Sequence, residues 1–305
     1  INLLGITDLV QPIATGPGSG GPHDAFDYPL NKTAILEANR QGGISLEAHN
    51  LGPFGASDVP VNVIQGLADG LDQLEPEHYY RFLDCGFHIG LGNGSDHPAR
   101  VAGCVRTYVQ VEGDFTYRAW LDGLKSGCTF TTSGPLLLLT VESQGPGATL
   151  DIEAGQQLAG HLKAWSRHPL GQIEVVANHQ VVASLNTEAS SAELDFELTP
   201  TESLWVVARA SRDGKYDALN SPDAAHTSAI YLRVDGREAF RRESAEFWVN
   251  NLNNHIENVK QRGHFENEAQ LQEALDYLNK ALIKYQRLIE TDGTERPAAW
   301  EEPAT

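Results

Sequence analysis

The pattern of apolar and polar residues changes near residue 135. Between residues 136 and 234, short apolar runs are separated by turn-forming residues, and Leu204, Val206 and Ala208 alternate with side chains that face the other way. This two-residue period is typical of a strand. The expected strands are 136–142, 158–166, 172–178, 180–185, 193–198, 203–210 and 229–234. Such a succession of strands predicts an antiparallel β-sandwich of about 100 residues.

Residues 1–135 alternate instead between apolar strands and helices. The expected strands are 2–6, 44–48, 61–65, 70–74, 87–92 and 107–111. The expected helices are 32–41, 76–84 and 117–126, with Asn31 and Thr116 as N-caps. The Gly- and Pro-rich residues 16–22, followed by His23 and Asp24, predict a flexible loop. Alternation of strands and helices favours parallel pairing and an α/β sheet or barrel.

Residues 243–290 have the period of helices, with a break at 262–264. An apolar stripe recurs every four or three residues: Leu271, Leu275, Leu278, Leu282, Tyr285 and Ile289. We expect a helical hairpin that packs on the same chain. The sequence thus predicts an α/β domain over 1–135, a β-sandwich over 136–240, a helical hairpin over 241–292 and a disordered tail over 293–305.

The composition of the chain argues against some classes of function. The chain has 305 residues, is 41% hydrophobic and carries a formal net charge of -19, which argues against nucleic-acid binding because phosphate binding needs a basic surface. No apolar run reaches the roughly 20 residues of a membrane span, and no secretory signal is recognisable. The 3 cysteines form no C-x-x-C pair. We expect a soluble protein with a small-molecule substrate, which is either cytoplasmic or exported with its signal removed.

A carboxylate and an imidazole follow the expected strand 87–92. The strand stops at Asn93-Gly94, and Asp96 and His97 come next. In α/β folds the carboxyl edge of the sheet is where sites are built, and Asp and His together are common metal ligands. The same residues are also ordinary turn chemistry. A ligand site and a surface turn therefore both stay open.

His49 occupies the corresponding position after the expected strand 44–48. If the two strands belong to one sheet, their ends meet at the same edge. We therefore predict that His49 and Asp96 lie within a few ångströms of a shared ion or ordered water, with His97 close by and Asp72 as a further candidate. A lone histidine at a strand end is more often a surface or core residue, so the prediction depends on the pair.

Segments between residues 42 and 289 also resemble, in their order, one known group of enzymes. Residues 41–49 (QGGISLEAH) are similar to a QGG…H step, residues 66–74 to a mid-barrel strand, and residues 85–97 to a closing SDxH motif. Residues 106–109, 115–127, 131–136 and 225–231 and the helical tail resemble one branch of that group. The group is the PHP (polymerase and histidinol phosphatase) superfamily of metal hydrolases, and the branch is the carbaryl-hydrolase type.

The resemblance implies a distorted α/β barrel that carries divalent metal ions and hydrolyses carbamate, amide, ester or phosphoester bonds. Carried over by position, the metal ligands would be His49, Asp96, His97 and Asp72, the last in place of a glutamate. His49 and Asp96 would be the catalytic residues. Mixed imidazole and carboxylate ligands admit zinc, manganese or iron.

The chain also departs from the family pattern. It contains no His-x-His, and Ile6-Thr7-Asp8 is followed by Leu9 where the family has a histidine. Two explanations remain open: a fragment without the first strands, or a divergent member with an incomplete metal cluster. The leading hypothesis is a metal-dependent hydrolase. The alternative is a non-catalytic, degenerate PHP-like domain that forms a binding module with the β-sandwich.

Overall fold

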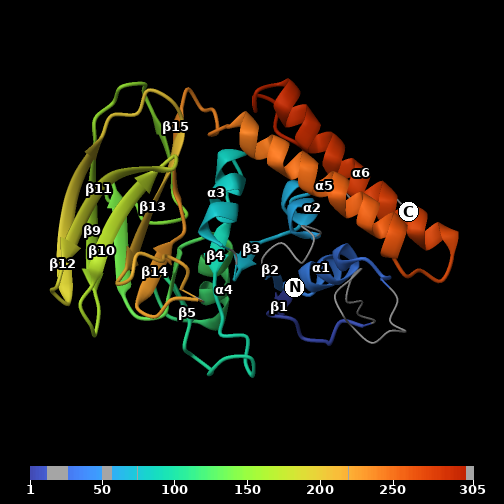
Figure 1. Cartoon of the computed structure of the whole chain (residues 1–305), viewed down its shortest axis with the longest axis horizontal. Coiled ribbons are helices and arrows are strands. Elements are labelled where there is room, and N and C mark those ends of the chain that lie inside the picture. Colours follow the sequence, from blue (N-terminus) through green and yellow to red (C-terminus); the bar gives the residue numbers. More distant parts are fainter. Residues whose placement is uncertain (12–26, 50–56, 74, 219, 300–305) are drawn as a thin grey trace. The chain divides into compact units, whose positions relative to one another are not determined.

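The structure is a computed structural model that describes residues 1–11, 27–49, 57–73, 75–218 and 220–299 (Figure 1). The chain forms two compact units. The first joins Ile1–Asp69 to Arg241–Thr305, and the second is Gly70–Phe240. The loop predicted at 16–22, with His23 and Asp24, lies outside the described residues. Each unit is considered separately below.

The first unit contains a small antiparallel strand pair. β1 (Asn2–Leu4) pairs with β2 (Ile44–Ala48), with Leu3 opposite Ser45. A Cβ at Gly43 would stand 2.7 Å from the Leu4 carbonyl oxygen, so this close approach requires glycine. Helix α1 (Asn31–Arg40) precedes β2, and Asn31 is its first helical residue rather than its N-cap, because Leu30 holds the cap position.

Residues 61–65 do not form the strand that the sequence predicts. They lie in and just after helix α2 (Val59–Ile64), which has a proline in its first turn. Proline is favoured there because the missing N–H has no intrahelical partner to lose. Every residue of α2 is buried, so no polar face marks the helical period, and the β-branched valines favour a strand in isolation. The strand prediction is therefore wrong.

The tail forms the expected helical hairpin, α5 (Arg242–Arg262) and α6 (Glu268–Glu290), which run side by side (Figure 1). The Asn267 side chain caps α6 by accepting a hydrogen bond from the Gln270 amide. The buried face of α6 is rotated slightly from the predicted stripe: Ala274, Tyr277, Leu278, Ala281, Tyr285 and Leu288. This face packs on α5 and α2 of the same chain.

Part of the tail expected to be disordered is described and contacts the hairpin. Lys284 Nζ donates a 2.7 Å hydrogen bond to the Ala298 carbonyl, and Arg287 forms an ion pair with Glu295. Residues 300–305 lie outside the described part of the chain.

The second unit begins with a strand–helix–strand segment. β3 (Gly70–Asp72) lies parallel to β4 (Gly90–Gly92), with Leu71 opposite Leu91, and α3 (Pro76–Asp84) connects them. Parallel pairing is confirmed for this segment. It is wrong for β1 and β2, which pair antiparallel. Helix α4 (Tyr117–Lys125) also begins as expected, since Thr116 Oγ1 accepts a 3.1 Å hydrogen bond from the Ala119 amide.

The rest of the second unit is a β-sandwich (Figure 1). The larger sheet has the order β11-β10-β13-β14-β6-β5, with β15 on β13 and β8 on β15, and the smaller sheet has the order β12-β9-β7. Leu139 and Leu162 from the smaller sheet share one buried core with Val175 and Val206 from the larger. The predicted β-sandwich is thus confirmed, but it is not wholly antiparallel, since β8 pairs with β15 in parallel. The strands are β5 (Arg106–Val109), β6 (Thr129–Thr132), β7 (Leu136–Val141), β8 (Thr149–Ile152), β9 (Leu158–Trp165), β10 (Gly171–Ala177), β11 (Gln180–Thr187), β12 (Ser191–Leu198), β13 (Leu204–Ser211), β14 (Ala224–Thr227) and β15 (Ile230–Val234).

The boundary expected at residue 135 falls inside the second unit. The reason is that β6 pairs with β14, with Thr131 opposite His226, and this brings β5 and β6 into the larger sheet. The division at Phe240 lies where the hairpin was expected to begin. The chain is thus a mixed α/β protein with a β-sandwich part, and the distorted barrel implied by the resemblance remains a proposal.

Candidate functional site

The carboxyl ends of β3 and β4 bring two predicted site segments together. Asp72 is the last residue of β3 and is buried, and it lies opposite Gly92 in the parallel register. Its Oδ2 atom lies 3.9 Å from the point where a Cβ at Gly94 would stand. Asp72 is therefore beside the turn that leads to Asp96.

The residues after β4 form the turn that the sequence left open, and the ligand site stays a prediction. Asp96 and His97 are exposed, and Asp96 has a positive φ of 52° with its carbonyl accepting from the Ala99 amide, as in a tight turn. Asn93 is anchored to Thr107, whose hydroxyl lies 2.7 Å from the Asn93 amide. The side-chain oxygen Oδ1 of Asn93 is buried and has no hydrogen-bond partner. Such an acceptor is costly unless water or a ligand satisfies it.

A shared site of His49 and Asp96 stays a prediction. His49 is exposed at the end of β2, with a positive φ of 72°, and belongs to the first unit, whereas Asp72, Asp96 and His97 belong to the second. Within the described residues, no three His, Cys, Asp or Glu side chains form a group able to hold a metal ion.

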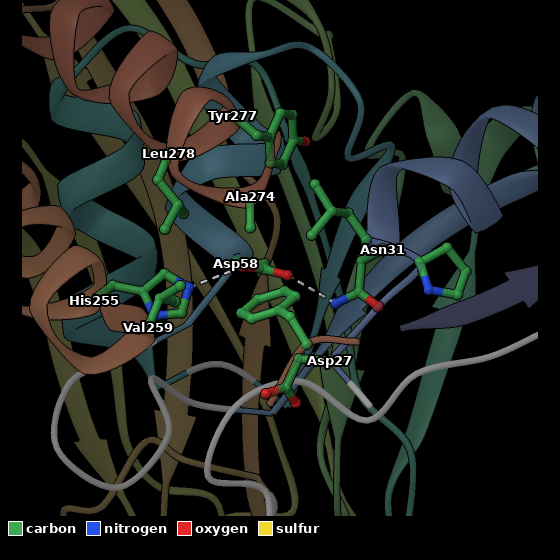
Figure 2. Close-up of a pocket in the computed structure, with 11 residues that line it drawn as sticks. Asp27, Asn31, Asp58, His255, Val259, Ala274, Tyr277 and Leu278 are labelled. Carbon is green, nitrogen blue, oxygen red and sulfur yellow. Dashed lines mark hydrogen bonds and ion pairs between the residues drawn. The ribbon is translucent and has the colours of Figure 1, made fainter. Parts of the chain in front are cut away.

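The first unit contains a pocket that the sequence did not indicate (Figure 2). Its mouth is open to solvent, and its cavity volume is about 20 Å³. The polar lining comes from Asp27, Asn31, Asp58, His255 and Tyr277. The apolar lining comes from Pro29, Leu30, Val259, Phe265, Ala274 and Leu278. A mostly apolar concavity with a few polar groups is the usual form of a small-molecule site.

Asp58 is the centre of the polar wall. Its Oδ1 atom accepts a 2.9 Å hydrogen bond from His255 Nε2, and its Oδ2 atom accepts a 3.0 Å bond from Asn31 Nδ2 (Figure 2). Burial alone would raise the pKa of Asp58, but the hydrogen bond and charge of His255 and the bond from Asn31 outweigh it, and the pKa is lowered. Asp58 is thus an ionised acceptor at neutral pH.

The bond to Asp58 fixes the proton of His255 on Nε2, because an ionised carboxylate can only accept. The His255 side chain is only 4% exposed, and its Nδ1 atom is buried without a partner. In the neutral tautomer Nδ1 therefore carries an unused lone pair. An imidazole oriented by a carboxylate in this way can act as a base or as a hydrogen-bond acceptor.

Asp27 supplies a second carboxylate. It is buried, its Oδ2 atom accepts a 2.7 Å hydrogen bond from the His264 amide, and its own amide donates to the His264 carbonyl. Burial raises the pKa of Asp27, and the nearby charge of Asp58 acts in the same direction. The two carboxylates of this pocket therefore repel one another.

A buried hydrogen-bond chain runs from the pocket wall to β2. Tyr277 Oη donates a 2.6 Å hydrogen bond to Asn62 Oδ1, and Asn62 Nδ2 donates a 2.7 Å bond to Glu47 Oε1. Burial raises the pKa of Glu47 to about 7. Glu47 stands two residues before His49, so a group that titrates near neutral pH lies close in sequence to a predicted ligand.

Two signals in the sequence could have indicated these residues. Glu47 is a charged residue within the otherwise mainly apolar strand β2, and His255 lies on the buried face of α5 with Trp248, Leu252 and Val259. Polar groups in such positions are buried only when they have partners. Nothing local identifies Asp58 or Asp27 as those partners, because their contacts join distant parts of the chain.

Comparisons with known proteins find no protein family and no curated protein that matches this chain. Among solved structures, the CARDB domain of PF1109 from Pyrococcus furiosus has 16% identity and a TM-score of 0.23, covering 33% of this chain and 97% of that domain. The fibronectin(III)-like modules of Clostridium thermocellum CbhA have 14% identity and a TM-score of 0.21, covering 32% and 97%. A Jonesia denitrificans lytic polysaccharide monooxygenase has 13% identity and a TM-score of 0.21, covering 44% and 79%. These scores are too low to support a functional conclusion.

None of the helices in the described residues is both long and apolar enough to cross a membrane.

Proposed function

We propose that this protein is a metal-dependent hydrolase that cleaves a carbamate, amide, ester or phosphoester bond of a small molecule. The observation that carries the proposal is the position of Asp72 beside the turn that holds Asp96. Parallel strands end at this edge, and edges of this kind are where α/β folds place their sites.

The side chains at this edge have the chemistry that a divalent ion requires. Asp72 and Asp96 offer carboxylate oxygens, His97 offers an imidazole, and the buried Asn93 Oδ1 is an acceptor with no partner. Zinc, manganese and iron all accept such mixed ligands. Since no ligand group is preassembled among the described residues, the proposal rests on donor chemistry.

A bound ion would lower the pKa of a coordinated water toward ~7 and polarise the scissile oxygen. The protein's own contribution is to orient the reactants. Asn93 Oδ1 can accept a hydrogen bond from a water or a substrate N–H. Thr107 holds Asn93 in place, since its hydroxyl both accepts from the Asn93 amide and donates to the Asn93 carbonyl, the latter at 3.0 Å.

Metal analysis and activity of the same preparation test the proposal. Protein purified without chelators should contain a divalent ion and hydrolyse at least one substrate from a panel of nitrophenyl esters, carbamates, anilides and phosphoesters. Asp72→Asn should lose both properties, whereas Asp114→Asn, at an exposed position of the same unit, should keep them. A folded protein with neither metal nor turnover would refute the hydrolase.

The second candidate is a non-catalytic binding module. The pocket of the first unit supports it, because its apolar wall and oriented polar groups suit ligand binding without chemistry. A ligand that binds stoichiometrically and is recovered unchanged, from a protein that is inactive on the whole panel, would favour this function.

A further inference from the structure

We propose that the pocket lined by Asp27, Asp58 and His255 binds a small organic cation, a primary or secondary ammonium group on a short apolar skeleton. The proposal is independent of the hydrolase function. It concerns only the first unit, which contains every lining residue in the described part of the chain.

Charge is the first argument. Among the residues that the structure describes, the lining contains two carboxylates and neither lysine nor arginine. The neighbouring Lys32 is already engaged, since its Nζ atom lies 2.9 Å from Glu273 and 5.2 Å from the centre of the Tyr277 ring. A cation entering the pocket would relieve the repulsion between Asp27 and Asp58.

Unused acceptors are the second argument. Each oxygen of Asp58 accepts one hydrogen bond from the residues that the structure describes, and a carboxylate has about four acceptor positions. In the described part of the chain, Asp27 Oδ2 accepts from His264, and no donor to Asp27 Oδ1 is found. His255 Nδ1 is a buried ring nitrogen without a partner, and it is an acceptor when the ring is neutral. An ammonium group has only donors, and it therefore complements a wall composed mainly of acceptors.

The aromatic and aliphatic residues of the lining indicate which type of cation the pocket would bind. Phe265 and Tyr277 provide aromatic surface, and Leu278 and Val259 provide aliphatic surface. Aromatic and aliphatic walls beside carboxylates suit an amine with an apolar body. A bare metal ion fits less well, because Asp27, Asp58 and His255 do not converge as metal ligands in the described structure.

Calorimetric titration of the whole chain with three probes of similar shape tests the proposal. Benzylammonium should bind at one site, and benzyl alcohol and benzoate should bind at least tenfold more weakly. Asp58→Asn and Asp27→Asn should each weaken benzylammonium at least tenfold. Asp276→Asn, which removes an exposed carboxylate of α6 outside the pocket, should leave its affinity unchanged.

Equal affinity for benzylammonium and benzyl alcohol would overturn the proposal, and this comparison needs no variant. Retention of affinity within twofold by both Asp58→Asn and Asp27→Asn would also overturn it. If Asp58→Asn fails to fold, Asp27→Asn and the three-probe comparison decide. None of these results depends on hydrolysis, so failure of the hydrolase and failure of this site are distinguishable.

Discussion

The hydroxyl of Tyr277 lies 2.6 Å from Oδ1 of Asn62, although 215 positions separate the two residues in the sequence. This bond ties α6 to α2, and the Asn62 amide continues it to Glu47. Both Tyr277 and Asn62 are buried. The polar interior of the first unit therefore depends on the last long helix of the described chain.

Tyr277→Phe should lower the free energy of unfolding by about 1–3 kcal/mol, because it leaves the buried Asn62 Oδ1 without its donor. Urea denaturation measures the change. Tyr117→Phe is the matched control, since Tyr117 is 61% exposed, and it should change stability by less than about 0.5 kcal/mol. Equal stabilities of the two variants would show that the bond contributes nothing.

Glu47 should make stability depend on pH. Its pKa is raised from 4.5 to about 7 in the folded protein, so the folded state holds the proton more tightly than the unfolded state. The resulting stabilisation is complete below pH 4.5 and is lost as the pH rises through 7, by at most ~1.4 kcal/mol per pH unit. Unfolding free energies between pH 4.5 and 8 should therefore decline more steeply in the native protein than in Glu47→Gln. Parallel curves would contradict a titrating Glu47.

Asp96→Asn should abolish metal uptake while leaving the fold intact, because it keeps the side-chain shape in an exposed turn and removes the charge. His49→Ala should reduce metal content to a lesser degree. Plasma mass spectrometry of the purified variants, with circular dichroism as the folding control, checks both. Full metal content in Asp96→Asn would exclude Asp96 as a ligand.

Leu278→Asp should lower the melting temperature strongly, by the equivalent of about 3 kcal/mol or more, because it places an unpaired carboxylate in a buried helix face. Ile283→Asp, on the same helix at a position that is 62% exposed, should have little effect. Light scattering should find the same oligomeric state for both variants. Dissociation of a dimer into folded monomers by Leu278→Asp would mean that the face is an interface between chains.

The sequence predicted those helices and strands that are marked by a local pattern, such as a capping residue or an alternation of apolar and polar side chains. Thr116 has a capping side chain beside a helical period, and α4 begins there. The strands of the sandwich alternate in their apolar residues, and most of their bounds agree with the pattern. The strand β14 has only 4 residues, all buried, so it offers no alternation that a reader of the sequence could detect. The prediction for α2 was wrong for the same reason, since a helix that is buried on every side shows no helical period of apolar and polar residues.

The candidate sites were harder to predict from the sequence than the helices and strands. The edge with Asp72 and Asp96 could be inferred because Asp72 ends β3 and Asp96 lies in the turn after β4. The pocket could not, because Asp58 and His255 are 197 positions apart and meet only when the hairpin packs against α2. Pairings of this length depend on the tertiary fold, and a single sequence gives no direct sign of them.

The first unit is assembled from two stretches of chain that leave the ribosome at different times. Residues 1–69 emerge well before α5 and α6, whereas the contiguous second unit, 70–240, can complete itself during synthesis. Until the hairpin arrives, Asn62 lacks Tyr277, and Pro60 lacks the hydroxyl of Tyr285, which is made 225 residues later. Nascent chains should therefore carry an apolar early segment that needs protection by chaperones. Any premature stop before residue 241 should yield a folded sandwich attached to an unfolded, protease-sensitive arm.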